Sequence, residues 1–205
     1  MKIFKIEQRT PEWHELRRGK VTGTGLKRVM GRKDTQDTYF YEVLAERLST
    51  AGIESESAMD RGIRLEEEAI AFFEKKSGKL VERVGFIQSD FNVNIGCSPD
   101  GIIRKGKKYV ESVEVKCLSS GNHVRAWLTG SVPDEYFPQV VQAFIVNKDL
   151  QTMHVVFYDP RIEVKPYHVI KVDRKDVAQH VEDYKKAQLE FLERVESTLS
   201  KLIKI

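Results

Sequence analysis

Two short segments of the chain hold residues whose types and spacing could do chemistry. Asp100 lies in Ser98-Pro99-Asp100-Gly101, and Glu114 and Lys116 lie in Glu114-Val115-Lys116-Cys117. The first segment reads as a turn, and the second as the end of a strand. An acid at a turn, followed by an acid and a lysine two apart on a strand, suits metal-assisted hydrolysis of a phosphodiester.

Each of these residues has a part in that chemistry. Mg²⁺ prefers carboxylate and carbonyl oxygens, which Asp100, Glu114 and the main-chain carbonyl of Val115 could supply. Lys116 shares a face with Glu114, because side chains two apart in a strand point the same way. Its ammonium group would therefore lie beside the metal, where it could orient or deprotonate the attacking water.

Each half of this pattern also has an ordinary structural explanation. An isolated Asp-Gly is usually a turn. An isolated Glu-x-Lys on a strand is usually a solvated surface pair. The combination favours the nuclease interpretation, because Pro99 stiffens the turn and a hairpin of suitable length separates the two segments.

The periodicity of apolar residues predicts the elements that position these side chains. Gly78 is well placed to cap one of the helices at its C-terminal end. Helices are expected over 10–31 (two, joined by a turn), 36–50, 58–77, 133–147 and 174–203. Strands are expected over 84–88, 93–97, 102–104, 109–115, 153–158 and 164–172, with a hairpin turn at 105–108.

This order of elements predicts an α/β (α+β) fold. A central mixed sheet flanked by helices, in a single domain spanning residues 1–205, accommodates helices, antiparallel strands and then helix–strand–strand–helix. No stretch of about 18 apolar residues occurs, so we expect no membrane span. The two cysteines form no Cys-x-x-Cys motif, which argues against a zinc or iron–sulfur site and favours a reducing cytoplasm.

The net charge of +3 does not by itself indicate a partner, but its distribution is uneven. Residues 1–33 hold ten Lys or Arg against three acids. A locally basic face on a near-neutral protein suits contacts with phosphate groups. An ordinary solvated surface with uneven charge explains the same numbers equally well.

Four motifs in order resemble one family. The Asp100 and Glu114-Val115-Lys116 segments resemble the PD-(D/E)XK nuclease superfamily, which implies a restriction-endonuclease-like core. Segments 13–22 (WHELRRGKVT), 61–66 (RGIRLE) and 136–142 (YFPQVVQ) narrow the resemblance. Together they resemble the lambda exonuclease family, also called the YqaJ-type viral recombinases.

The resemblance assigns further roles in catalysis. Asp100, Glu114 and Lys116 match the catalytic triad of the family. Glu66 matches an acid on a helix that faces the metals, although a helix-surface charge is the alternative. Gln139 matches a glutamine near the reactive centre, although a solvent-facing amide is the alternative.

The resemblance also implies contacts to DNA. Arg17 and Thr24 match the arginine and the hydroxyl residue that hold a 5′-phosphate, and Arg binds phosphate oxygens in a bidentate way. The alternatives are a surface charge for Arg17 and a helix N-cap for Thr24. Arg32 falls near a further basic DNA contact. The family commonly has Thr-Ala-Ser where this chain has Thr22-Gly23-Thr24, which keeps the hydroxyl group.

We therefore expect a Mg²⁺-dependent 5′→3′ exonuclease that degrades one strand of linear double-stranded DNA to mononucleotides. Two metal ions are expected, with Mn²⁺ able to substitute. The family implies a homotrimeric ring, a single-strand annealing protein as partner and a role in phage recombination, in the cytoplasm of a bacterial host. The alternatives are a PD-(D/E)XK endonuclease and a catalytically inert DNA-binding module.

Overall fold

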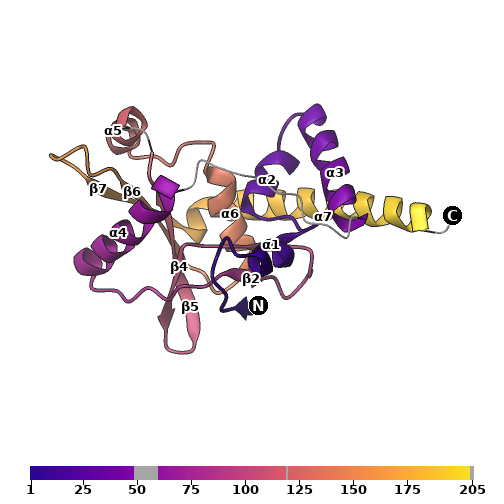
Figure 1. Cartoon of the computed structure of the whole chain (residues 1–205), viewed down its shortest axis with the longest axis horizontal. Helices are drawn as coiled ribbons and strands as arrows, with labels where there is room; N and C mark the ends of the chain where they lie inside the picture. The colour runs from indigo at the N-terminus through magenta and orange to yellow at the C-terminus, as the bar shows by residue number, and fades with distance from the viewer. Residues whose placement is uncertain (49–59, 119, 204–205) are drawn as a thin grey trace.

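The computed structural model describes residues 1–48, 60–118 and 120–203. Its α-helices are α1 Pro11–Arg17, α2 Gly23–Val29, α3 Lys33–Leu48, α4 Asp60–Ser77, α5 Ser120–Thr129, α6 Phe137–Val146 and α7 Ala178–Ile203, the last preceded by a 3₁₀ turn at Arg174–Val177. Its strands are β1 Lys2–Phe4, β2 Phe86–Gln88, β3 Gly96–Cys97, β4 Gly101–Lys105, β5 Lys108–Lys116, β6 Thr152–Tyr158 and β7 Tyr167–Asp173. Figure 1 shows α2 and α3 lying alongside the long helix α7.

The larger sheet is mixed and has the strand order β4-β5-β6-β7. Only the β5–β6 pair is parallel, and it places Glu114 beside Val155 and Lys116 beside Phe157. A parallel pair needs a long crossover, and here the chain between the two strands forms α5 and α6. Strand β5 therefore lies in the interior of the sheet between β4 and β6, and its end at Glu114–Lys116 pairs with β6.

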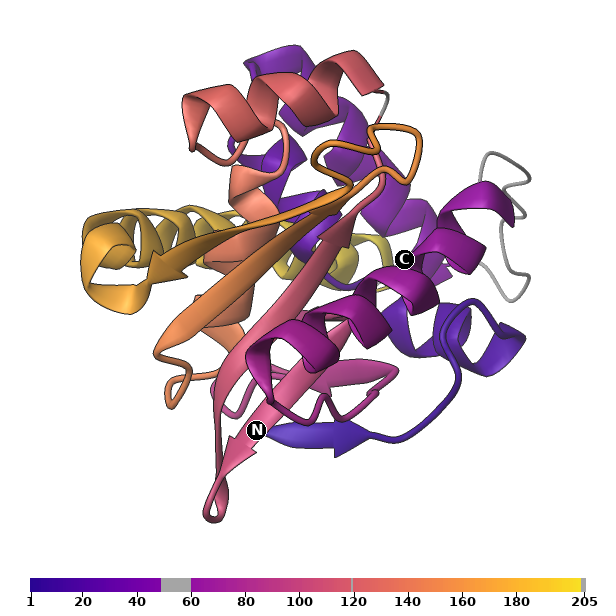
Figure 2. The same ribbon diagram turned by 90° about the vertical axis from the view of Figure 1, so that its left-hand side faces the viewer.

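Helices cover both faces of this sheet. In Figure 2, α4 crosses the near face while α6 and α7 lie behind. On the α4 side, Phe73 packs in a buried cluster with Val113 and Val115. On the other side, Phe144 of α6 belongs to a second cluster that contains Phe157. Since side chains alternate along β5, Glu114 and Lys116 point to the α6 side, opposite Val113 and Val115.

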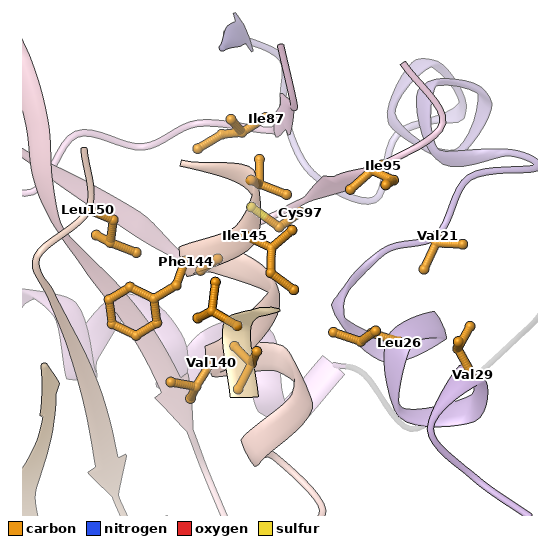
Figure 3. Close-up of a cluster of buried hydrophobic side chains, with 14 of the residues drawn as sticks. Val21, Leu26, Val29, Ile87, Ile95, Cys97, Val140, Phe144, Ile145 and Leu150 are labelled. Carbon is orange, nitrogen blue, oxygen red and sulfur yellow. The ribbon is translucent and has the colours of Figure 1, made fainter. Parts of the chain in front are cut away.

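The second cluster extends from the sheet into the N-terminal helices. Figure 3 shows Val140, Phe144 and Ile145 of α6 between Leu150 on one side and Leu26 and Val29 of α2 on the other. These apolar contacts hold α2 against α6. They fix the position of the Thr24 end of α2 relative to Gln139 of α6.

A smaller three-stranded sheet, β1-β2-β3, brings the N-terminal segment to the turn that carries Asp100. Its last strand ends at Cys97, directly before the Ser98–Gly101 turn. An isolated bridge between Val21 and Ile95 ties the segment before α2 to the loop before β3. Residues far apart in the sequence thus meet beside Asp100.

The turn between α1 and α2 depends on a glycine. Gly19 has a φ of 66°, and a Cβ there would lie 2.6 Å from Cγ of Arg47. Helix α3 holds this turn from both sides, because Gly19 donates to Glu46 (2.7 Å) and accepts from Arg47 Nε (2.8 Å). The turn fixes the direction in which α1 presents Arg17.

The expected fold class, a mixed sheet flanked by helices, is confirmed, and Gly78 has the positive φ (69°) of a helix C-cap. The hairpin around Gly106 is also confirmed. Residues 49, 50, 58 and 59 of the expected helices lie outside the described residues. No helix in the described part of the chain is long and apolar enough to cross a membrane.

Four expected elements have other bounds in the structure. The helix expected over 133–147 begins at Phe137, because Tyr136 donates to the Pro133 carbonyl (2.9 Å) in a preceding turn. The strand expected over 164–172 begins at Tyr167, because Lys165 N–H closes a turn onto Ile162. The strands expected over 84–88 and 93–97 are shorter, at β2 and β3. Helix α5 and strand β1 were not expected.

Candidate active site

Asp100 is fixed by the strand that carries the other acid. Its Oδ2 accepts the main-chain N–H of Val115 at 2.7 Å. As a whole residue, Asp100 is half-buried. Burial, the Glu114 carboxylate and the Glu66 carboxylate raise the pKa of Asp100 well above its usual range. The turn and β5 thus form a region with an excess of negative charge.

Lys116 connects Glu114 to helix α6. Its Nζ donates to Glu114 Oε1 at 2.8 Å and to Gln139 Oε1 at 2.6 Å. Burial lowers the pKa of Lys116, but the charge of Glu114 and the hydrogen bond to it outweigh burial, and the net shift is upward. Lys116 is therefore an ammonium group at neutral pH in this arrangement.

Gln139 continues this chain of contacts toward α2. Its Nε2 donates to the Thr24 hydroxyl at 3.3 Å. Gly23 allows this approach, because a Cβ there would lie 3.2 Å from Cα of Gln139. Four residues predicted from the sequence, Glu114, Lys116, Gln139 and Thr24, thus form one continuous line of polar contacts.

Arg17 faces the same region from α1. Its Nη1 donates to the Ser98 hydroxyl at 2.6 Å, and its Nη2 lies 3.3 Å from the Thr22 hydroxyl. The guanidinium lies over the Trp13 ring, 4.2 Å from its centroid. Burial lowers the pKa of Arg17 to about 10, so the group is still a cation at neutral pH. These contacts with Ser98, Thr22 and Trp13 fix the position of the guanidinium.

Arg17, Thr24 and Gln139 share a small cavity with Glu114. The cavity measures about 40 Å³, and it has room for on the order of two water molecules. Its lining residues are Arg17, Gly23, Thr24, Cys97, Ser98, Pro99, Glu114, Gln139 and Ala143. A permanent cation, two hydroxyl groups and an amide at one cavity suit a phosphate group.

Glu66 and Arg32 do not line this cavity. Glu66 lies on α4 and is buried, and both its oxygens pair with arginines: Arg9 Nη2 at 2.7 Å and Arg83 Nη2 at 2.9 Å. It acts on Asp100 through its charge. Arg32 is exposed just before α3 and does not line the cavity. Of the residues predicted for the site, it alone is not brought to the others.

The donor set near Asp100 fits a hard divalent cation. Asp100 and Glu114 offer carboxylate oxygens and Val115 offers a main-chain carbonyl, which are ligands that Mg²⁺ prefers. Among the described residues, no group of three or more His, Cys, Asp or Glu is arranged to hold one ion. The fit therefore rests on two carboxylates and one carbonyl.

Several residues of the site were given no role in the sequence analysis. Ser98 lines the cavity and accepts a hydrogen bond from Arg17, and the Trp13 ring packs against the Arg17 guanidinium. Arg9 and Arg83 engage Glu66. Ser98 belongs to the segment that carries Asp100, so its nearness to the site could have been expected from the sequence. Nothing in the sequence pattern signals Arg9 or Arg83.

Comparison with known protein families shows which family the chain belongs to. The model of the YqaJ-like viral recombinase domain matches residues 12–149. The chain belongs to this family. The match spans both the Arg17 segment and Gln139, so it includes every predicted site residue. No curated protein has a sequence that matches the chain.

Solved structures agree with this assignment. The chain is similar to an alkaline exonuclease, LHK-Exo, from Laribacter hongkongensis, with 28% identity, a TM-score of 0.80, and coverage of 95% of this chain and 99% of that one. The complex of LHK-Exo with dAMP matches with 27% identity, a TM-score of 0.79 and the same coverage. A phage related exonuclease from Haemophilus somnus 129PT shares the fold, with 15% identity, a TM-score of 0.60 and coverage of 91% and 99%.

Proposed function

We propose that this YqaJ-family protein is a Mg²⁺-dependent 5′→3′ exonuclease that removes mononucleotides from 5′-phosphorylated ends of double-stranded DNA. One observation carries the proposal. Glu114, an expected metal ligand, also lines the cavity that holds the Arg17 guanidinium. A terminal phosphate in that cavity would therefore lie next to the hydrolytic centre.

This arrangement favours an exonuclease over an endonuclease. A cation beside the reactive centre could bind an internal or a terminal phosphate, so the enclosure of the cavity is what distinguishes the two enzymes. The cavity is small and closed on one side by Cys97 and Ala143, which suits a chain end better than a continuing strand. The dAMP in the complex of the alkaline exonuclease is a mononucleotide of the kind that we propose as product.

The residues of the site have distinct tasks in the hydrolysis. A divalent ion held by Asp100, Glu114 and the Val115 carbonyl would neutralise phosphate charge and favour ionisation of water. The ammonium group of Lys116 orients the attacking water. The water oxygen bonds to phosphorus, and the bond to the 3′-oxygen of the terminal nucleotide breaks. The 3′-oxygen takes up a proton and leaves.

The direction of bond cleavage has a consequence for repeated digestion. The phosphate stays on the remaining strand as a new 5′-phosphate. Each cut thus recreates the group that Arg17 and Thr24 would hold. The remaining strand then needs to advance by one nucleotide before the next cut.

The wider setting is proposed from family membership. We infer that residues 1–205 form one nuclease domain that acts in a homotrimeric ring. A single-strand annealing protein would take up the 3′ tails in phage-type recombination, in the cytoplasm of a bacterial host. The basic segment 1–33 would face the DNA backbone. We propose two Mg²⁺ ions at the site, with Mn²⁺ as a substitute.

One experiment separates the three candidate functions. Linear duplex with 5′-phosphate ends and closed circular DNA are incubated with Mg²⁺ and either the wild-type protein or Lys116→Ala. Mononucleotide release from linear DNA alone, lost in the variant, supports the proposal. Nicked circles would favour an endonuclease. Binding of duplex without cleavage would favour an inert DNA-binding module.

A further inference from the structure

Two arginines hold the carboxylate of Glu66. Arg9 Nη2 lies 2.7 Å from Oε2, and Arg83 Nη2 lies 2.9 Å from Oε1. The Glu66 side chain is 9% exposed, so water does little to weaken these contacts. Hydrogen bonds between ionised groups in such surroundings are among the stronger ones in proteins. The position of Glu66 is therefore set by Arg9 and Arg83.

Arg83 also holds the turn that carries Asp100. Its Nη1 donates to the main-chain carbonyl of Asp100 at 2.6 Å, while its Nη2 pairs with Glu66. One guanidinium thus bridges the acid on α4 and the turn before β4. The Arg83 side chain is 46% exposed, so it has space to move if Glu66 leaves it.

Arg9 occupies a strained backbone position. Its φ is 71°, and it is the only non-glycine residue with a positive φ in the described part of the chain. This conformation is unfavourable for a residue that carries a Cβ. Strain of this kind persists only where the surroundings fix the residue, and it occurs often at switch regions. The ion pair with Glu66 is one contact that fixes Arg9.

The acids Glu114, Glu66 and Asp100 differ in whether an ion pair balances their charge. Glu114 pairs with Lys116, and Glu66 pairs with Arg9 and Arg83. Asp100 has no ion pair among the described residues, and it lies within the electrostatic influence of the other two acids. A divalent cation beside Asp100 would attract Glu66 and repel the guanidinium groups that now hold it.

We propose that Arg9 and Arg83 bind the Glu66 carboxylate while no cation is present, and that a divalent cation at Asp100 and Glu114 competes with them for it. This inference rests on the proposed function, because that function places the cation there. It makes Arg9 and Arg83 positioning residues that act through Glu66. Removal of either arginine should tighten cation binding, and most of this gain should depend on Glu66.

The test is Mn²⁺ binding measured by titration calorimetry without DNA. The variants are Arg83→Gln, Arg83→Lys, Arg9→Gln, Glu66→Gln and the double variant Arg83→Gln/Glu66→Gln. Arg83→Gln and Arg9→Gln should each lower the Kd for Mn²⁺ by about tenfold or more, the range expected for one hydrogen bond to a charged group. Arg83→Lys should also lower the Kd, although it keeps the charge, because a lysine lacks the planar pair of nitrogens with which Arg83 reaches Glu66 and the Asp100 carbonyl at once.

The double variant decides between competition and a general charge effect. In the Glu66→Gln background, Arg83→Gln should lower the Kd much less, because only the direct repulsion between Arg83 and the cation is then removed. An equal gain in both backgrounds would overturn the inference, and so would weaker Mn²⁺ binding by Arg83→Gln alone. Arg194→Gln is the matched control, because Arg194 pairs with Asp37 at 2.9 Å and is 50% exposed. It should bind Mn²⁺ as the wild type does.

Nucleotide release is measured separately, so the two proposals can fail independently. A protein that binds Mn²⁺ with the expected pattern but releases no nucleotide would contradict the proposed function alone. A protein that degrades duplex ends but shows no dependence on Glu66 would contradict the inference alone. Thermal melts of each variant confirm that it is folded before titration.

Discussion

Lys116 and Gln139 are joined by a hydrogen bond of 2.6 Å between Nζ and Oε1. The other end of the same amide, Nε2, lies 3.3 Å from the hydroxyl of Thr24. One side chain from α6 therefore connects the residue that would orient the attacking water with a residue that would hold the terminal phosphate. The two ends of the site cannot move independently while this amide keeps both contacts.

Gln139→Leu should lower kcat on 5′-phosphorylated duplex by about tenfold, with a smaller change in KM. Leucine keeps the volume but removes both hydrogen bonds, so Lys116 loses one of its two acceptors, and loss of precise positioning alone can reduce rates by that much or more. Steady-state rates on a labelled duplex provide the measurement. Gln179→Leu, an exposed glutamine on α7, should leave both constants unchanged. An equal loss in the two variants would contradict the role of Gln139.

Acid should destabilise the protein through His168. Burial, then His123 and Lys165, lower the pKa of His168 to about 4, whereas in the unfolded chain it is about 6.5. Between these values the unfolded state binds more protons, so stability falls as the pH falls from 6.5 toward 4. We expect a loss on the order of 2 kcal/mol in unfolding free energy across that range from this residue.

Urea unfolding at pH 7 and pH 4.5 measures this loss. His168→Phe should reduce the pH dependence, because a phenyl ring keeps the stacking on Phe157 and cannot be protonated. His14→Phe, at an exposed position, should keep the wild-type pH dependence. An unchanged pH dependence in His168→Phe would rule out the explanation.

Gly19→Ala should destabilise the fold by about 2 kcal/mol or more, from the cost of a left-handed alanine and from the contact with Arg47. Gly106→Ala separates these effects, because Gly106 also has a positive φ (62°) but no atom lies within 4 Å of its Cβ position. Gly121→Ala is the control, because Gly121 has neither a positive φ nor an atom within 4 Å of its Cβ position, and it should cause no loss of stability. Thermal unfolding of the three variants gives the order, and a Gly19→Ala loss no greater than that of Gly106→Ala would contradict the role of Arg47.

The local sequence pattern predicted most elements because each has a clear period or a clear end signal. Gly78 ends α4 and Gly106 turns the β4–β5 hairpin, and both are visible as isolated glycines between periodic segments. Helix α5 was missed because its apolar residues, such as Ala126, are few and its outer face exposes Trp127 and Leu128. Strand β1 was missed because three residues are too short to show alternation.

Contacts in the site could be predicted between residues that are close in the sequence. Contacts between residues that only tertiary packing brings together could not. The relation of Glu114 to Lys116 follows from strand geometry alone. The pairing of Arg9 and Arg83 with Glu66 depends on how α4 lies across the N-terminal segment, which no local pattern encodes. Ser98 adjoins the Asp100 turn, but its contact with Arg17 also needed the fold.

The rate of digestion from 5′-phosphate and 5′-hydroxyl duplex ends, compared for the wild type and Arg17→Gln, tests the central claim most directly. The wild type should prefer the phosphorylated end by at least about tenfold, because a charged hydrogen bond contributes 1.5–3 kcal/mol. Arg17→Gln should lose this preference and keep its rate on the hydroxyl end. Arg32→Gln, which removes an exposed charge outside the cavity, should keep the preference. Equal wild-type rates on the two ends would contradict a terminal-phosphate site at Arg17.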